Sequence, residues 1–242
     1  EGEREFPHPF FFGSKVSLKP VHWLEVGFAR TGIFGGDGAP PFDLEDFGDV
    51  FLLGGSDQKQ NKSDEIAGFD LRVHLFPLGF DFYWERFGEH HFSHFPFSGG
   101  EANLWGIYVP DVFGLAVRGE YFDSTNEGPV WYRHSVFTSG YTYKGKILGH
   151  HAGGDGKDYS VEVKASPLEG VRLTLSYDYE KRGASLPAPE THRQVLFGAT
   201  HQVGKICMSF HLGHESVSNA GFKPESEETD TFITFSIVRT FD

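Results

Sequence analysis

Residues 69–84 read FDLRVHLFPLGFDFYW and alternate apolar with polar side chains on both sides of a short interruption. Successive side chains of a β-strand point to opposite faces, so Phe69 and Leu71 fall on one face and the charged residues between them on the other. The same alternation resumes at Phe80, directly after the segment 77–79. We therefore predict two antiparallel strands joined by a tight hairpin.

This alternation recurs along the rest of the chain and predicts roughly a dozen strands. The clearest other runs are 115–121, 159–165, 171–179, 206–212 and 233–241, and weaker runs lie at 14–20, 21–34, 101–109, 141–149 and 191–203. Many of these runs are long. A strand of a soluble protein has about 5 to 6 residues, whereas a tilted strand needs about 9 to 11 to cross a bilayer.

The connections between the predicted strands alternate in length. Short ones are expected at 77–79, 110–111, 166–170 and 203–204, and long ones at 35–63, 87–100, 123–140, 150–157, 182–190 and 214–228. Short turns on one rim and long loops on the other are typical of outer-membrane barrels. Aromatic residues near strand ends, namely Trp23, Trp84, Tyr179 and Phe241, match the girdles found at membrane interfaces.

These features predict an all-β fold, an antiparallel transmembrane β-barrel of the bacterial outer membrane. We expect its apolar face to contact lipid, and in the first hairpin this face carries Phe69, Leu71, Val73, Leu75, Phe80, Phe82 and Trp84. Periodicity alone does not tell which face meets water. A soluble sandwich or a lipocalin-like barrel therefore remains the alternative fold.

Composition excludes several classes of function. The chain has 242 residues, and 21 Lys and Arg against 34 Asp and Glu give a formal net charge of −13, which argues against a nucleic-acid partner. Its single cysteine, Cys207, can form neither an internal disulfide nor a thiolate zinc site. No apolar stretch is long enough for a membrane helix, because the run 102–117 is interrupted by Pro110 and Asp111.

Three segments carry a resemblance to a known family. They are KPVHWLEVGFARTGIFGGDG at 19–38, AGFDLR at 67–72 and WYRHSVFTSGYTYKGKILGH at 131–150. From about residue 13 to its end the chain resembles the capsule assembly Wzi family. The resemblance implies an outer-membrane barrel that helps to organise or tether surface polysaccharide. Because members of that family are longer, we expect residues 1–242 to form a single β-barrel domain that corresponds to the C-terminal portion of a larger barrel.

The third of these segments is also the candidate binding site. No acidic residue occurs between Glu127 and Asp155, and cationic and aromatic residues gather there. Sugar faces stack on aromatic rings, and the carboxylates of an acidic glycan pair with cations. The candidate glycan-binding residues are Trp131, Tyr132, Arg133, His134, Tyr141, Tyr143, Lys144, Lys146 and His150. A purely structural role, with the rings as an interface girdle and the cations balancing carboxylates elsewhere, remains open.

We predict a non-enzymatic protein without a cofactor. The chain has neither a nucleophile-elbow motif nor a Walker loop nor a dinucleotide-binding glycine motif. The histidines His90, His91 and His94 lie in a long loop, where their spacing is too weak a signal to assign a metal site. The expected partners are capsular or exopolysaccharide, outer-membrane lipid and lipopolysaccharide. A porin-like passive channel with a cation-preferring acidic lumen is the alternative function.

Overall fold

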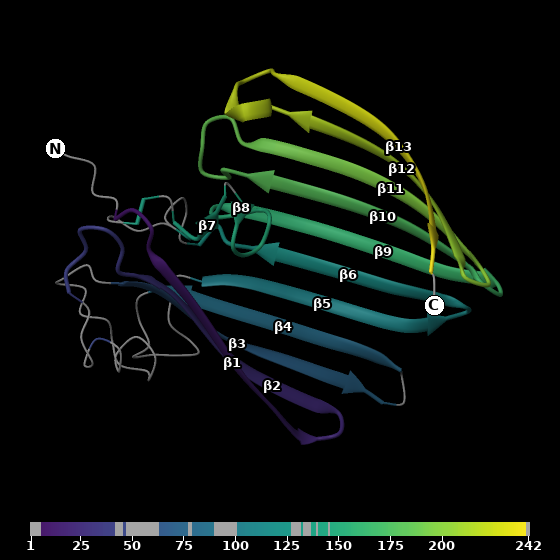
Figure 1. Ribbon diagram of the computed structural model, residues 1–242, viewed down its shortest axis with the longest axis horizontal. Helices are drawn as coiled ribbons and strands as arrows, with labels where there is room; N and C mark the ends of the chain where they lie inside the picture. Colours follow the sequence, from purple (N-terminus) through teal and green to yellow (C-terminus); the bar gives the residue numbers. More distant parts are fainter. Residues whose placement is uncertain are drawn as a thin grey trace. The chain divides into compact units, whose positions relative to one another are not determined.

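The computed structural model describes residues 6–41, 46, 63–76, 79–89, 101–126, 132, 137–138, 140–144 and 146–240, and the statements below concern these residues. Most of them belong to long strands, which are labelled in Figure 1. The elements are β1 (Phe10–Val21), β2 (Leu24–Phe34), β3 (Ser63–Leu75), β4 (Phe80–Glu89), β5 (Glu101–Val112), β6 (Leu115–Asp123), β7 (Thr142–Tyr143), β8 (Lys146–Ile147), β9 (Gly156–Leu168), β10 (Val171–Arg182), β11 (Glu190–Val203), β12 (Ile206–Ser218), η3 (Ala220–Phe222) and β13 (Glu227–Arg239).

Eleven of the strands form one sheet whose order follows the chain, β1-β2-β3-β4-β5-β6-β9-β10-β11-β12-β13. The short strands β7 and β8 pair only with each other, as a separate hairpin. The sheet pairings are antiparallel between β1 and β2 and from β9 through β13. The prediction of an all-β antiparallel fold is therefore confirmed.

The contacts divide the chain into two compact units. Unit 1 contains Glu1–Arg72, Trp84–Leu104 and Asp123–Asp155, and unit 2 contains Val73–Tyr83, Trp105–Phe122 and Gly156–Asp242. Unit 1 holds the β1–β2 and β7–β8 hairpins, and unit 2 holds the whole of β9 to β13. The expected single domain over residues 1–242 stays a prediction.

The register of unit 2 assigns each side chain to a face of the sheet. Tyr177 on β10 lies opposite Val161 on β9 and Val195 on β11, and these residues share what we call the apolar face. Glu180 lies opposite Asp158 and belongs to the other, polar face. The pairing of β10 with β11 and of β11 with β12 continues without interruption, so the alternation in sequence becomes two continuous surfaces.

Burial on these two faces is the reverse of what a water-soluble sheet shows. Exposure on the apolar face is 47% for Tyr159, 47% for Val161 and 51% for Leu175. On the polar face Asp158 and Glu180 are only 3% and 4% exposed. A soluble sandwich would bury the apolar face and leave the carboxylates in water. A barrel in lipid requires the arrangement seen here.

The structure corrects the predicted turn at 110–111. Pro110 and Asp111 lie inside β5, and the chain reverses at Phe113 and Gly114. Both turn residues have positive φ, 54° and 82°, a conformation that glycine adopts without steric cost. The Gly114 amide donates a hydrogen bond to Asp111 Oδ1 at 2.8 Å, so Asp111 stabilises the turn from the preceding strand. Alternation alone carries no such information about φ.

The predicted strand at 141–149 is also wrong as a member of the main sheet. That segment forms the β7–β8 hairpin, in which Thr142 pairs with Ile147 and Tyr143 with Lys146. The backbone reverses at Lys144, whose φ is +50°. Near the C-terminus β12 reaches Ser218 and β13 starts at Glu227, so the predicted loop 214–228 is shorter than expected.

Candidate functional site

The segment that follows β6 in unit 1 is anchored by a buried tyrosine. Tyr141 is 1% exposed, and its hydroxyl donates a hydrogen bond to the backbone carbonyl of Asp64 at 2.9 Å. Its ring meets the ring of Phe11 edge-on, with centroids 6.1 Å apart and planes at 89°. Phe137, 2% exposed, packs against Phe6 in the same way, with centroids 5.9 Å apart. These contacts hold the segment against β1 and β3.

The neighbouring strand positions of β2 and β3 hold a buried ion pair. The Arg30 guanidinium donates to a carboxylate oxygen of Glu65, and the two side chains are only 2% and 6% exposed. Ser63 Oγ donates to the other oxygen of Glu65 at 2.9 Å. Asp64, on the opposite face of β3, is 2% exposed. We call Arg30 and Glu65 the buried ion pair.

Tyr132 and His150 form a second set of contacts within the segment. The Tyr132 hydroxyl accepts a hydrogen bond from the His150 backbone amide at 3.3 Å, and His150 Nδ1 accepts one from the Ala152 amide at 3.3 Å. Gly149 lets the Tyr132 ring approach the backbone, because a Cβ at 149 would lie 2.5 Å from the Tyr132 hydroxyl oxygen and the ring would have to shift. These two predicted site residues therefore shape the loop backbone.

The β7–β8 hairpin presents the remaining described candidates to solvent. Tyr143 is 61% exposed, and Lys144 Nζ lies 5.2 Å from the centroid of its ring. Lys146, opposite Tyr143 in the register, is exposed as well. An exposed ring with an ammonium group beside it, and a second lysine opposite it in the register, can stack on a sugar face and pair with its carboxylate. We call Tyr143, Lys144 and Lys146 the hairpin tip.

The structure thus separates the predicted residues by role. Tyr132 and Tyr141 lie together, with ring centroids 6.0 Å apart, and Tyr141 is inaccessible to a ligand. The hairpin tip is accessible. Trp131, Arg133 and His134 lie outside the described residues, as do His90, His91 and His94.

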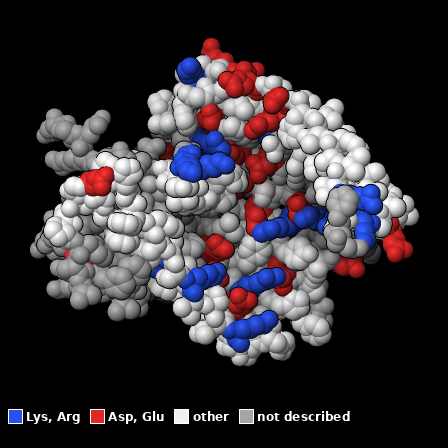
Figure 2. All heavy atoms as spheres, viewed as in Figure 1, with Lys and Arg blue, Asp and Glu red and all other residues white. Residues whose placement is uncertain are grey.

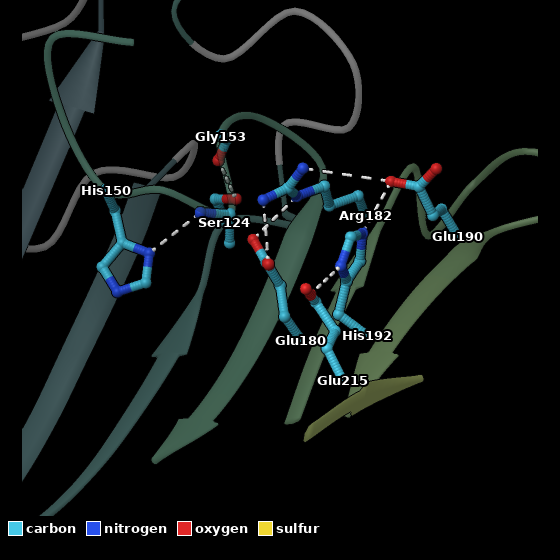
Figure 3. Close-up of polar contacts among 9 residues, drawn as sticks. Ser124, His150, Gly153, Glu180, Arg182, Glu190, His192 and Glu215 are labelled. Atoms are coloured by element: carbon cyan, nitrogen blue, oxygen red, sulfur yellow. Dashed lines mark hydrogen bonds and ion pairs between the residues drawn. The ribbon is translucent and has the colours of Figure 1, made fainter. Parts of the chain in front are cut away.

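Sequence reasoning missed a charge network at the ends of β10, β11 and β12 in unit 2. Its members are Glu180, Arg182, Glu190, His192 and Glu215, and Figure 3 shows their side chains converging. Arg182 donates to both oxygens of Glu180, from Nε at 2.8 Å and from Nη2 at 2.9 Å. We call these residues the strand-end charge network. Its signal in the sequence is a glutamate followed two residues later by a basic side chain, Arg at 180–182 and His at 190–192.

His192 connects two carboxylates in this network. Its Nε2 lies 2.8 Å from Glu190 Oε1, and its Nδ1 lies 2.9 Å from Glu215 Oε1. An imidazole that donates from both nitrogens carries a positive charge. The backbone amide of Gly221, in the connection to β13, donates to Glu190 Oε2 at 2.6 Å. Glu190 itself comes from β11 and is labelled in Figure 3. The network therefore ties the β12–β13 connection to the ends of β10 and β11.

Elsewhere on the surface, cations and carboxylates are mixed. Figure 2 shows Lys and Arg interspersed with Asp and Glu on the face turned to the viewer. Tyr83 of unit 2 donates its hydroxyl proton to Glu120, which also accepts from Arg118 Nη2 at 2.7 Å. Among the described residues, no helix combines the length and the hydrophobicity needed to cross a membrane.

The strand order, the long strands and the exposed apolar face define the class as an antiparallel β-barrel fold of the outer-membrane type. The chain belongs to the family of the capsule assembly protein Wzi, which it matches over residues 1–232. The predicted resemblance is confirmed.

Among solved structures with the same fold is Wzi of Escherichia coli, described as an outer membrane protein involved in group 1 capsule assembly and as a carbohydrate-binding β-barrel. The TM-score is 0.77 at 24% sequence identity, over 97% of this chain and 53% of that one. The chain thus spans about half the length of that structure. No curated protein matches the sequence significantly.

Proposed function

We propose that the protein is a non-enzymatic outer-membrane barrel that takes part in capsule assembly and binds capsular or exopolysaccharide. We place the binding site at the loop end, the end of the strands where the longer connections lie. Family membership over residues 1–232 is the observation that carries this proposal. Two further points support it. The solved relative is described as a carbohydrate-binding barrel of the outer membrane, and the apolar face of unit 2 is the exposed one. In this location the barrel would contact outer-membrane lipid and lipopolysaccharide.

Within the loop end, we infer that the hairpin tip contacts the polysaccharide. The 61% exposed ring of Tyr143 offers a stacking surface, and Lys144 and Lys146 offer positive charge to an acidic sugar. Tyr141 acts as a positioning residue, since its ring is buried and its hydroxyl donates to the Asp64 carbonyl. Trp131, Arg133 and His134 remain predicted contributors on sequence grounds.

Glycan binding by the full-length purified protein tests the tip. We expect Tyr143→Ala to weaken binding of capsular polysaccharide about fivefold to tenfold, the equivalent of about 1 to 1.4 kcal/mol, with little dependence on salt. Lys144→Gln combined with Lys146→Gln should weaken it in low salt and have less effect in high salt, because salt screens exposed charges.

Phe113→Ala is the matched aromatic control, since Phe113 is fully exposed in the tight turn between β5 and β6. Lys223→Gln is the matched control for charge, in the connection between β12 and β13. Neither control should change glycan binding. Unchanged binding by folded Tyr143 and Lys144/Lys146 variants would show that the tip is not the site.

The membrane location is tested by the two faces of β10. Leu175 lies near the middle of β10 on the apolar face, and Ser176 follows it on the polar face. Leu175→Arg should lower the free energy of unfolding in lipid vesicles by about 2 to 4 kcal/mol, while Ser176→Arg should lower it much less. The readout is the migration of boiled and unboiled protein on a gel. Equal costs at the two positions would contradict contact of the apolar face with lipid.

A further inference from the structure

Three cations occupy one end of the apolar face of unit 2. Lys157 on β9 lies directly opposite Lys181 on β10 in the register. Arg193 on β11 lies opposite Tyr179, the residue two positions before Lys181 and therefore on the same face. The apolar-face positions of β9, β10 and β11 carry no Asp or Glu, whereas the adjacent strand β6 ends at Asp123, on the same face as Tyr121. We call Lys157, Lys181 and Arg193 the rim cation cluster.

The oxygens of an anion bound at this end of the face can accept charge-assisted hydrogen bonds from Lys157 and Lys181, which lie opposite each other in the register. Arg193 adds a planar fork of donors that suits a phosphate group. The arrangement therefore favours a multiply charged anion over a neutral ligand.

Directly next to the cluster the apolar face carries a row of tyrosines. Tyr121 and Tyr159 stack with centroids 4.6 Å apart, and Tyr159 and Tyr179 follow at 6.0 Å. The Arg193 guanidinium carbon lies 5.7 Å from the centroid of the Tyr179 ring. Tyrosines in such a row sit at the level of lipid headgroups, with the ring toward the hydrocarbon and the hydroxyl toward water.

Beyond the tyrosines the same face becomes aliphatic. Val161 and Val195 flank Tyr177 there, and Leu175 follows, with exposures of 43% to 51%. From the strand ends inward the face thus runs from cationic through aromatic to aliphatic. A lipid with a phosphorylated headgroup, a polar interfacial region and acyl chains matches this order. Its phosphates would meet the cations, its interfacial region the tyrosines and its acyl chains the aliphatic side chains.

The cluster lies at the loop end of the strands. Lys157 is the second residue of β9 and Lys181 is the second to last of β10. At this end lie the connections 183–189 and 219–226, whereas the tight turns at 169–170 and 204–205 lie at the other (Figure 1). In outer-membrane barrels the longer loops face the exterior, so this end meets the outer leaflet.

We propose that the rim cation cluster binds the phosphate groups of lipopolysaccharide, with the tyrosine row against its interfacial region and the aliphatic band against its acyl chains. The proposal rests on the outer-membrane location proposed above and adds a lipid partner on the face opposite the polar one. It assigns to Lys157, Lys181 and Arg193 a function separate from the hairpin tip.

The test uses the full-length protein in nonionic detergent with purified lipopolysaccharide as the probe. We expect the triple variant Lys157→Gln, Lys181→Gln, Arg193→Gln to bind at least about tenfold more weakly, a loss of about 1.4 kcal/mol. Enzymatically dephosphorylated lipopolysaccharide should bind the wild type as weakly as the intact lipid binds the variant. Arg172→Gln is the matched control, because Arg172 is a cation of the same strand β10 at its tight-turn end on the other face.

Several outcomes would overturn the proposal. One is equal lipopolysaccharide binding by the wild type and the triple variant, and another is equal binding of the phosphorylated and dephosphorylated lipid. Full competition by phosphatidylglycerol would show a general anionic-lipid surface instead. Loss of polysaccharide binding with intact lipopolysaccharide binding would assign the cluster to the glycan.

Gel migration of unboiled protein checks that each variant is folded. If the triple variant does not fold, the salt dependence of wild-type binding decides, because phosphate pairing weakens as ionic strength rises. Failure of the outer-membrane location itself is seen separately, as absence of the protein from the outer-membrane fraction.

Discussion

The buried ion pair of unit 1 and the strand-end charge network of unit 2 both pair opposite charges, but they differ in their exposure to water. Each places charged side chains at the loop ends of neighbouring strands. Arg30 and Glu65 are 2% and 6% exposed. The side chain of Arg182 is 37% exposed, although the side chain of its partner Glu180 is buried. The first is a dry pair and the second a network open to water on one side.

The two regions also differ in the segments that lie next to them. In unit 1 Tyr141 reaches the Asp64 carbonyl, and Phe137 is buried close by in the same segment. In unit 2 the covering chain is the 219–226 connection, which contributes the Gly221 amide to Glu190. Buried charges depend on each partner far more than exposed ones do, because an unpaired ion in a dry site has lost its water. The two regions should therefore respond unequally to the same substitution.

The largest effect is expected at the buried ion pair. Arg30→Met removes the cation and leaves the Glu65 carboxylate buried, so the free energy of unfolding should fall by about 3 to 5 kcal/mol. Denaturant titration of the full-length protein in lipid vesicles measures it. The double variant Arg30→Met, Glu65→Gln should recover most of the loss, because no unpaired charge remains. A cost below that of Arg182→Met would contradict the comparison.

A smaller effect is expected in the network. Arg182→Met removes two charge-assisted hydrogen bonds to Glu180, but water reaches this site and replaces part of them. We expect a loss of about 1.5 to 3 kcal/mol, the range for a hydrogen bond to a charged group. The same titration provides the measurement. Lys181→Met, next to it on the other face, is the control and should leave the network intact.

The segment that Tyr141 anchors in unit 1 can be loosened without creating a buried charge. Tyr141→Phe keeps the ring and removes the hydroxyl that donates to the Asp64 carbonyl, so we expect a loss of about 0.5 to 1.5 kcal/mol. Hydrogen exchange should rise over 137–150 while β9 to β13 keep their protection. If protection in that segment is unchanged, the hydroxyl does not hold it in place.

The smallest effect is the response to salt. At about 1 M salt the Debye length is about 3 Å, so exposed charge pairs are strongly screened and buried ones much less. The cost of Arg182→Met should therefore shrink in high salt, while that of Arg30→Met should stay nearly constant. Parallel titrations at low and high salt measure both. A similar reduction for the two variants would show that water reaches the buried ion pair.

Much of the fold could be predicted, because a strand leaves a local signature. Alternation located the hairpin around 77–79 and the strands near 159–165 and 171–179, now β9 and β10. The turn after β5 was missed, since positive φ at Phe113 and Gly114 leaves no mark in the alternation. The 141–149 segment alternates like a strand, yet it folds as a short hairpin that begins next to the buried Tyr141, whose hydroxyl donates to the Asp64 carbonyl.

The candidate site was predicted less completely. Its location between Glu127 and Asp155 followed from the local lack of acidic residues and the density of aromatic rings. The sequence could not separate the buried Tyr141 from the exposed Tyr143, because both are tyrosines in one short motif. The strand-end charge network was missed, since Glu190, His192 and Glu215 come together only when β11 and β12 pair.

The sequence by itself determined the strands, their two unlike faces and the family, because these depend on the order of side chains along the chain. Only the tertiary structure decided which face is exposed, which tyrosine anchors the loop segment, and which cations share a rim. The reason is physical. Burial and pairing arise between residues far apart in sequence, as between Tyr141 and Asp64 or between Lys157 and Lys181, and they are fixed by register and packing.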